Sequence, residues 1–356
     1  MSSIDHRLSS YDYELPPEFI AQNPCVPRDR SRLMCIDVQR QISDRHFFEL
    51  PQFLQPGDLL VLNNTKVIPA RLYGHKETGT AVEILLTEPL AAANCWTALV
   101  KPGKRFKLGS KIIFSEQLSA EVVDYDPETR GRKLQFYLKG IDSLDQAIAN
   151  LGQVPFPPYV TASQATADQY QTIYAKTPGA IAAPTAGLHF TPELLQQLSD
   201  LGVAQTQITL HVGIGTFRPV ETEDITQHEI HSEWLEVNEA AIAKIKATKA
   251  NGGRVIGIGT TVARSLESSK FKPYRGKTNL MIYPGYEWQV LDGLITNFHL
   301  PKSSLLMLVA SFLGEDGRQF LLDAYARAIT QGYRFYSFGD AMLIWRSHNS
   351  TPLTDT

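Results

Sequence analysis

The sequence predicts an α/β fold in which a discontinuous main domain carries an inserted all-β domain. Outside residues 72–150, apolar strands alternate with amphipathic helices, which is the pattern of an α/β domain. Within 72–150, short runs of β-forming residues recur about every ten residues between Gly, Pro or charged turns, as in a β-sandwich or barrel. We assign residues 1–71 and 151–346 to the main domain, whose sheet is either open or barrel-like, and residues 347–356 to a mobile tail.

Composition supports two ordinary globular domains and no general attraction to nucleic acid. Of the 356 residues, 43% are apolar and 20% are charged, which is enough for sizeable cores. With a net charge of −3, any nucleic-acid partner needs a local basic patch. The three cysteines, Cys25, Cys35 and Cys95, are scattered and lack C-x-x-C spacing. This argues against a disulfide framework or a cysteine-based zinc site and fits a reducing compartment.

The sequence predicts neither a signal peptide nor a membrane-spanning segment. Its N-terminus is polar and has no apolar core of a signal peptide. The longest apolar run, residues 304–314, is shorter than the ~20 residues of a membrane span and predicts a buried helix. We therefore expect a cytoplasmic protein, and we expect a monomer.

Several segments of the main domain have clear start and stop signals. Pro16 and Pro17 predict the start of a short helix. The run 58–67 predicts a buried strand that ends in a polar cluster. Residues 191–202 predict a helix with a Thr191 cap, Pro192 at the first position and Gly202 at the stop. The remaining helices and the strand–turn–helix unit are expected at 143–152, 238–253, 304–314 and 254–270.

Gly- and Thr-rich strings follow several of these strands, and we expect them to converge on one cleft. They lie at residues 63–65, 185–189, 211–215, 257–260 and 296–299. In GIGTTVARSLE (257–267), a helix starts near Val262, so backbone N–H groups and the helix dipole favour an anionic ligand group. The string is neither G-x-G-x-x-G nor a Walker loop, and an ordinary strand-to-helix turn fits it equally well.

Titratable residues in these strings are the candidates for proton transfer. His189, His211 and His299 each lie between apolar and polar residues, and imidazole is the commonest group for proton transfer near neutral pH. A hydrogen-bonded structural histidine is the alternative for each. Asp340 follows Gly339 between apolar residues, where a capping role is the alternative. His228 and His231 lie in HEIHSEW, which is not the H-E-x-x-H zinc motif and favours capping or substrate anchoring.

Two basic stretches stand out in this mildly acidic chain. Aromatic residues are interleaved with cations in both, and such stretches contact phosphates and stack on bases. A solvated charged loop is the alternative for each. The cations are Lys270, Lys272, Arg275 and Lys277 in one stretch, and Lys101, Lys104, Arg105 and Lys107 in the other.

Taken together, nine strings closely resemble the S-adenosylmethionine:tRNA ribosyltransferase-isomerase family of queuosine biosynthesis. The resemblance runs in sequence order from Tyr11 to Ile344 and is weakest in 72–150. The family string NDTKVIPARL has Asn64 in place of its Asp here, so no acid–base role is carried over to that position. The strings are YDYELPPEFIAQNP, PGDLLVLNNTKVIPARLYG, APTAGLHFT, LHVGIGTFRPV, HSEW, GIGTTVARSLES, IYPGY, LITNFHLPKSSLLMLV and YRFYSFGDAMLI.

The resemblance implies transfer of the ribosyl part of S-adenosylmethionine to 7-aminomethyl-7-deazaguanine at the tRNA wobble position. The ribose is isomerised to give epoxyqueuosine, and adenine and methionine leave. S-adenosylmethionine is then a consumed co-substrate, and neither a cofactor nor a metal is expected. tRNA is the second substrate, and the two basic stretches are our candidates for contacting it. Because a C5′ proton must be removed and adenine must leave, the site needs two or three titratable groups.

On this basis we expect His189 and His211 to transfer protons, with His299 or Asp340 assisting. We expect Gly259, Thr260 and Thr261 to hold the ribose or the methionine carboxylate, and an aromatic residue to stack on adenine. The full set of expected substrate-binding residues is Thr185, Gly187, Phe190, Gly215, Thr216, Phe217, Gly259, Thr260, Thr261, Arg264, Tyr283 and Asn297.

Two other classes of protein fit parts of the sequence. An S-adenosylmethionine-dependent RNA methyltransferase would use the GIGTT loop for its cofactor and release S-adenosylhomocysteine. A non-catalytic RNA-binding adaptor would use the β domain and basic loops and would bind tRNA without consuming S-adenosylmethionine. Product analysis distinguishes all three.

Overall fold

The computed structural model describes residues 3–127, 129–217 and 219–346. It divides into a main unit, Met1–Thr65, Pro158–Thr177 and Ala183–Thr356, and an inserted unit, Lys66–Pro157 and Pro178–Ala182. The inserted unit thus begins before Leu72 and includes a short segment that the sequence assigned to the main domain. The reason is that the residues just before the first barrel strand, such as Ala70, already pack in the barrel core. The expected mobile tail, residues 347–356, lies outside the described residues.

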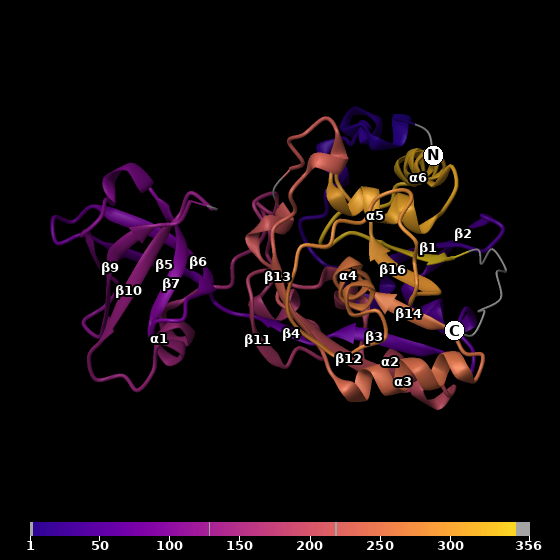
Figure 1. The fold of residues 1–356 in the computed structure, drawn as a ribbon, viewed down its shortest axis with the longest axis horizontal. Coiled ribbons are helices and arrows are strands. Elements are labelled where there is room, and N and C mark those ends of the chain that lie inside the picture. Colours follow the sequence, from indigo (N-terminus) through magenta and orange to yellow (C-terminus); the bar gives the residue numbers. More distant parts are fainter. Residues whose placement is uncertain (1–2, 128, 218, 347–356) are drawn as a thin grey trace. The chain divides into compact units, whose positions relative to one another are not determined.

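The main unit is built on an open sheet of nine strands (Figure 1). Because the sheet has free edges at β15 and β2, the main domain is not barrel-like. The central strands β12, β3, β14 and β16 are parallel neighbours, whereas β13, β15, β17 and β2 each pair antiparallel with a neighbour. In order across the sheet, the strands are β15 (Tyr274–Thr278), β13 (Glu233–Val237), β12 (Ala204–Leu210), β3 (Leu59–Asn63), β14 (Val255–Ile258), β16 (Gly293–Asn297), β17 (Ala341–Trp345), β1 (Arg32–Ile36) and β2 (Ile42–His46).

Helices cover both faces of the central strands, which is why all five residues of β3 are buried apolar or hydrogen-bonded side chains. In Figure 1, α3 lies below β3, and α4 lies above it. The main unit contains α2 (Pro192–Asp200), α3 (Glu239–Ala250), α4 (Thr260–Ser269), α5 (Ser304–Phe312) and α6 (Gly317–Thr330). None of the helices in the described part of the chain has the length and apolar character that crossing a bilayer requires.

Side-chain caps fix where several helices begin. The Oγ1 of Thr191 accepts from the Leu194 N–H, which confirms the predicted start of α2. Asn238 and Ser303 cap α3 and α5 in the same way. The helix expected at Pro16–Pro17 is only a single 3₁₀ turn. The short 3₁₀ segments are η1 (Ser3–His6), η2 (Leu8–Tyr11), η3 (Pro17–Phe19), η4 (Arg28–Arg30), η5 (Phe47–Gln52), η6 (Gly103–Arg105), η7 (Ala167–Tyr170), η8 (Thr185–His189), η9 (Ile214–Phe217) and η10 (Ile225–Gln227).

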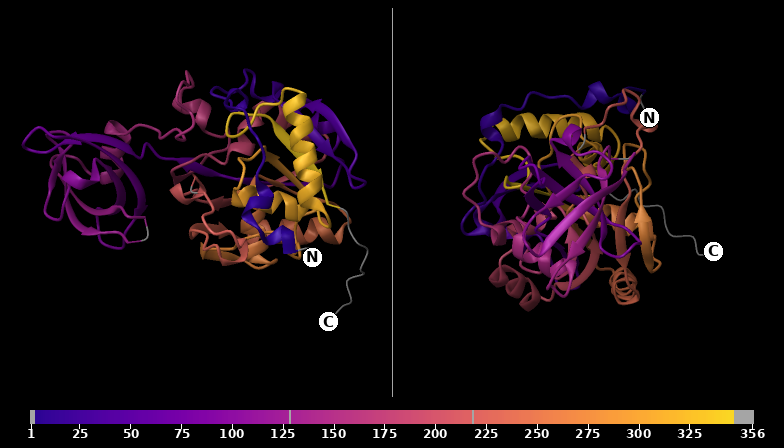
Figure 2. Two further views of the ribbon diagram at one scale, coloured as in Figure 1. Left: turned by 90° about the horizontal axis from the view of Figure 1, so that it is seen from above. Right: turned by 90° about the vertical axis from the view of Figure 1, so that its left-hand side faces the viewer.

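The inserted unit is a closed six-stranded barrel, so the expected all-β insertion is confirmed and takes the barrel form (Figure 2). Alternate residues of its strands point inward, and the helix α1 (Leu144–Leu151) adds Ala147 and Ile148 to the barrel core. In order around the barrel, the strands are β10 (Arg132–Leu138), β7 (Cys95–Lys101), β6 (Ala81–Pro89), β5 (Arg71–His75), β8 (Lys111–Ile113) and β9 (Leu118–Tyr125).

The chain enters the barrel after β4 (Thr65–Val67) and leaves it after Gln153, which forms an isolated antiparallel bridge with Arg71 at the start of β5. β4 and β11 (Thr177–Ala180) form a separate two-stranded sheet. The Ile68 N–H donates to the Ala180 carbonyl at 2.9 Å just beyond this pairing. Neither β4 nor β11 is part of the nine-stranded main sheet.

Candidate active site

The carboxyl ends of the four central parallel strands meet at one edge of the main sheet. β12 leads into His211, β3 into Asn64, β14 into Gly259 and β16 into Phe298. This is the edge at which open α/β sheets bind ligands. The expected strand ends thus lie at one edge, but of the five strings only 211–215 contributes a residue to the lining of a cavity there, and Thr185–His189 is the 3₁₀ segment η8, which packs against β16.

The side chain of Asn63 forms hydrogen bonds that connect the ends of β3 and β12 to the helix that follows β14. Its side-chain oxygen accepts from the N–H groups of Leu210 (3.0 Å) and Thr65 (3.2 Å). Its amide nitrogen donates to the Leu210 carbonyl (3.0 Å) and to the Thr261 hydroxyl (3.3 Å). Asn63 is almost fully buried, so these bonds hold β3, β12 and the first turn of α4 in fixed register.

His211 is a half-buried imidazole at this edge. Its Nδ1 lies 2.8 Å from the Thr65 hydroxyl, and its ring stacks on Trp234 with centroids 5.0 Å apart. Burial lowers its pKa from the ordinary value of 6.5, so the ring is neutral at neutral pH. Among the described residues, Nε2 has no hydrogen-bond partner. When Nδ1–H donates to Thr65, Nε2 carries the lone pair that accepts a proton.

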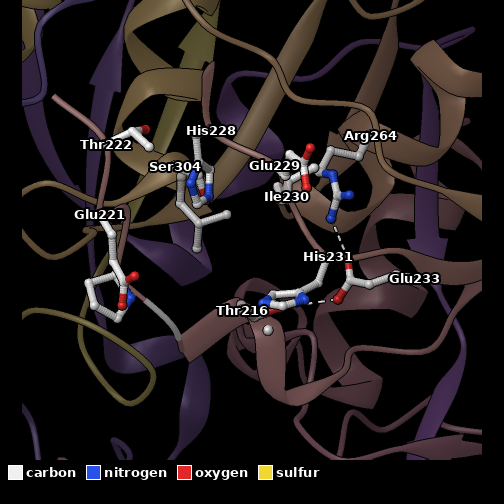
Figure 3. A pocket seen from close by; sticks show the side chains of 13 residues that line it. Thr216, Glu221, Thr222, His228, Glu229, Ile230, His231, Glu233, Arg264 and Ser304 are labelled. Atoms are coloured by element: carbon white, nitrogen blue, oxygen red, sulfur yellow. Dashed lines mark hydrogen bonds and ion pairs between the residues drawn. The ribbon is translucent and has the colours of Figure 1, made fainter. Parts of the chain in front are cut away.

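A cavity of about 250 Å³ opens beside this edge, between the segment that follows His211 and the helices α4 and α5 (Figure 3). The residues expected at the site that line it are Gly215, Thr216 and Arg264. The others are Pro219, Glu221, Thr222, His228, Glu229, Ile230, His231, Glu233, Ser304 and Leu305.

A buried ion pair between Arg264 and Glu233 forms the innermost part of this lining. Each residue is only 6% exposed. One Glu233 oxygen pairs with Arg264 Nη1, and the other accepts from the Gly213 N–H and the Thr216 hydroxyl, both at 3.1 Å. Arg264 Nε donates to the Leu280 carbonyl at 3.0 Å, but buried Nη2 has no hydrogen-bond partner among the described residues. A buried pair of this kind persists when its remaining donors are satisfied.

The segment from His228 to His231 forms another wall of the cavity. A Cβ on Gly215 would come within 2.6 Å of the His231 side chain, so only glycine allows this close approach. Burial lowers the pKa of His228, nearby His231 lowers it further, and Glu221 opposes the shift. Within the described residues, no group of three or more His, Cys, Asp or Glu side chains has an arrangement that suits a metal ion.

His189 does not line this cavity; it belongs to a buried hydrogen-bond network. Its Nδ1 lies 2.7 Å from the Ser31 hydroxyl, and its Nε2 lies 3.1 Å from Asn297 Nδ2. Thr185 donates to Asn297 Oδ1, which orients the amide toward His189. Burial, with smaller contributions from Arg334 and Arg28, lowers the His189 pKa to about 3. With both ring nitrogens engaged, the geometry favours a positioning role over the expected proton transfer.

His299 and Asp340 are likewise engaged by the protein. His299 is 5% exposed, and its Nε2 lies 2.9 Å from the Thr296 hydroxyl. Burial lowers its pKa to about 3. The Asp340 carboxylate is 2% exposed and accepts from the backbone N–H groups of Arg32 (2.9 Å) and Arg334 (2.8 Å). The geometry of Asp340 is that of the capping alternative rather than of a catalytic acid.

The aromatic residues and the glycine that we expected to contact the substrate do not lie together in the structure. Phe190 is fully buried and packs edge-on against Phe47, so it fills the core and cannot stack on adenine. Gly187 is buried against Tyr174. Tyr283 lies against His6 and does not line the cavity. Phe217 ends η9, and its side chain lies outside the described part of the structure.

The loop at the start of α4 is shaped as the sequence predicted, with Gly259 at φ +91°. This left-handed conformation favours glycine, and the Gly259 N–H donates to the Ile295 carbonyl at 2.7 Å. Thr260 and Thr261 follow as the first residues of the helix. Thr261 is therefore held to Asn63, at the same edge as His211.

The basic residues lie in exposed positions on both units. Lys270, Lys272, Arg275 and Lys277 are exposed around the edge strand β15 of the main sheet. Lys101, Lys104 and Arg105 are exposed around η6 of the barrel, where Arg132 donates to the carbonyls of Gly103 and Phe106. In the main unit, Arg275 Nε lies 3.9 Å from a Glu236 carboxylate oxygen.

Glu233 and Trp234 were not among the expected site residues, whereas Asn63 was expected only as part of a strand end at the cleft. Asn63, Glu233 and Trp234 hold the His211 ring and the Arg264 guanidinium in place. Glu233 and Trp234 lie in HSEW, one of the strings that carry the family resemblance. Glu233 therefore had a local signal, but its partner Arg264 lies 31 residues away on another element.

The two buried histidines predict a loss of stability in acid. Their pKa values of about 3 in the folded state lie below the ordinary value of 6.5, so the unfolded chain binds more protons between these limits. The neutral histidines add their full contribution to the free energy of unfolding above pH 6.5. As the pH falls toward 3, this free energy decreases by about 1.4 kcal/mol per histidine per pH unit. Urea unfolding should show this slope in the wild type and a shallower one in His299→Gln. The exposed His75→Gln control should keep the wild-type slope, and an unchanged slope in His299→Gln would contradict the prediction.

Known proteins resemble this chain over nearly its whole length. The model of a family described as "Queuosine biosynthesis protein" matches residues 8–344. A protein of a Nostoc species named S-adenosylmethionine:tRNA ribosyltransferase-isomerase is 56% identical, over 96% of this chain and 93% of that protein. A protein of the same name from Natranaerobius thermophilus is 48% identical, over 95% and 99%.

A solved structure that is similar to this chain bears a name of the same kind as these relatives. The crystal structure of S-adenosylmethionine tRNA ribosyltransferase from Thermotoga maritima is 39% identical, with a TM-score of 0.53, and the match covers 94% of this chain and 99% of that one. The family expected from the nine strings is therefore confirmed. The chain belongs to the queuosine biosynthesis protein family.

Proposed function

We propose that this chain is an S-adenosylmethionine:tRNA ribosyltransferase-isomerase. It transfers the ribosyl group of S-adenosylmethionine to 7-aminomethyl-7-deazaguanine at the tRNA wobble position and isomerises it to give epoxyqueuosine. Adenine and methionine are the other products. Relatives at 56% and 48% identity bear the name of this enzyme. The observation in the site that best supports the proposal is the neutral His211 imidazole, with an open Nε2, at the edge where the central parallel strands end.

The chemistry of the reaction explains why such an imidazole is needed. The positive sulfonium makes the C5′ proton of the ribose acidic, and a neutral base nearby can remove it. Adenine is a poor leaving group unless its ring gains a proton. The aminomethyl group of the tRNA base must be neutral to attack. We assign the C5′ proton to His211 and propose that His228 or His231, in the cavity lining, exchanges protons with the other groups.

The proposed substrates also give a role to the exposed cations outside the cavity. In this proposal S-adenosylmethionine is consumed, and the enzyme uses neither a further cofactor nor a metal. The tRNA contacts the exposed cations Lys270, Lys272, Arg275 and Lys277, and those of the barrel, Lys101, Lys104 and Arg105. We propose that the enzyme acts as a monomer in the cytoplasm.

The decisive experiment is product analysis with tRNA that carries the deazaguanine precursor. After incubation with S-adenosylmethionine, mass analysis should find epoxyqueuosine in the tRNA digest and equal amounts of adenine and methionine in the supernatant. The same tRNA without the precursor should yield none of these products. Formation of S-adenosylhomocysteine would instead indicate a methyltransferase, and tRNA binding without consumption of S-adenosylmethionine would indicate an adaptor.

A further inference from the structure

We propose that the cavity beside α4 binds the amino-acid end of S-adenosylmethionine, with Arg264 holding its carboxylate and Glu221 or Glu229 its ammonium group. The inference rests on the proposed function and specifies one subsite of it. It assigns the carboxylate to Arg264 rather than to the Gly259–Thr261 loop.

The first part of the argument is the incomplete pairing of the Arg264 guanidinium. Arg264 is 6% exposed and lines the cavity. Its Nε and Nη1 have partners in Leu280 and Glu233, whereas its buried Nη2 has none among the described residues. A buried donor without a partner is destabilising by about 1–3 kcal/mol, more if charged, unless a ligand supplies an acceptor. A carboxylate is the acceptor that a guanidinium binds best.

The second part is the surplus of carboxylates on the same lining. Glu233 is fully engaged, because its two oxygens contact Arg264, Gly213 and Thr216. Glu221 and Glu229 also line the cavity, but within the described residues neither accepts a hydrogen bond nor joins an ion pair. Both are drawn on the cavity lining in Figure 3. An ammonium group or a sulfonium would be stabilised by these two charges.

The charge pattern also excludes the other obvious ligand. The Arg264–Glu233 pair is neutral as a unit, so Glu221 and Glu229 make the described part of the lining acidic. A tRNA phosphate would be repelled there, whereas S-adenosylmethionine brings one carboxylate, one ammonium and one sulfonium. The volume of about 250 Å³ lies below the usual range for a whole drug-sized ligand and suits one end of the molecule.

The cavity adjoins the chain segment that follows the proposed base. Glu233, which pairs with Arg264, also accepts from the Gly213 N–H at 3.1 Å, two residues after His211, and Gly215 and Thr216 line the cavity. In S-adenosylmethionine, C5′ is bonded to the same sulfur as the amino-acid chain. A ligand anchored through its carboxylate at Arg264 thus presents its sulfonium and C5′ toward the His211 side of the site.

The test compares binding of S-adenosylmethionine and its decarboxylated analogue to the full chain by calorimetry. The wild type should bind S-adenosylmethionine about 10- to 100-fold more tightly than the analogue. Arg264→Lys keeps a cation for Glu233 but removes the Nη2 donor, so its preference should fall to less than about 3-fold. Arg318→Lys, which alters an Arg–Asp5 pair outside this cavity, is the matched control and should keep the wild-type preference.

Further outcomes and variants distinguish an error in this inference from an error in the proposed function and from misfolding of the variant. A wild-type preference retained in Arg264→Lys would overturn the assignment of the carboxylate. Failure of the wild type to bind S-adenosylmethionine at all would instead overturn the proposed function. If thermal melting shows that Arg264→Lys is unfolded, the same comparison of the two ligands is made with the double variant E233Q/R264Q, which removes both charges of the pair.

The double variant E221Q/E229Q tests the ammonium assignment. It should bind S-adenosylmethionine more weakly but keep the preference over the decarboxylated analogue, and unchanged affinity would overturn that assignment.

Discussion

His211→Gln should slow single-turnover release of adenine by about 10²- to 10⁴-fold, the range for loss of a general base. The glutamine side chain can still bond to Thr65, which lies 2.8 Å from Nδ1, but it cannot accept a proton. S-adenosylmethionine binding should stay within about 3-fold of the wild type, because the cavity lining does not include His211. The matched control is the exposed His75→Gln in the barrel, which should react at the wild-type rate.

The pH profile gives this prediction a second readout. Burial lowers the pKa of His211, so the base is unprotonated at neutral pH and gains a proton only below 6.5. The wild-type rate should therefore be flat near neutral pH and fall on the acid side, while the residual rate of His211→Gln should lack that acid limb. A near-normal rate in His211→Gln, or an unchanged acid limb, would remove His211 from the proton transfer.

Asp340→Asn should lower the free energy of unfolding by about 2–4 kcal/mol while leaving turnover by the folded enzyme within about 3-fold. The carboxylate accepts from the N–H groups of Arg32 and Arg334, and the Arg334 guanidinium lies 3.4 Å away. An amide has a single oxygen, so one buried N–H must face the amide nitrogen. Urea unfolding measures the loss, and Asp323→Asn on the exposed face of α6 is the control that should change little.

The opposite pattern would restore the catalytic role that the sequence suggested for Asp340. Turnover reduced by more than about 100-fold, with the unfolding free energy unchanged, is what a lost proton-transfer group produces. The two readouts separate a residue that holds the β1 and β17 segments together from one that acts on the substrate.

Much of the fold could be predicted because its signals are local. The Thr191 cap, the apolar run of β3 and the strand–turn–helix at Gly259 each depend on a few neighbouring residues. The all-β insertion was predictable from its turn spacing for the same reason, although that spacing does not distinguish a barrel from a sandwich. The strand order was not, because it depends on contacts between distant segments, such as the pairing of β3 with both β12 and β14.

The site was predictable only in part, for the same physical reason. His189, His211 and His299 have similar sequence surroundings, but packing engages both ring nitrogens of His189 and leaves Nε2 of His211 open. Nor does the string around Phe190 indicate that the ring faces Phe47 rather than a ligand. The family could be identified despite this, because nine ordered strings carry more information than any one contact.

The short distance between the points where the chain enters and leaves the barrel has a consequence for how this protein can diverge. Arg71, the first residue of β5, bridges to Gln153 shortly before the chain returns to the main unit at Pro158, so the barrel is an insertion with neighbouring ends. Loops of the barrel can lengthen, shorten or change their charges while the nine-stranded sheet keeps its registers. Substitutions on the barrel surface can therefore accumulate without changing the residues at the His211 edge of the main sheet.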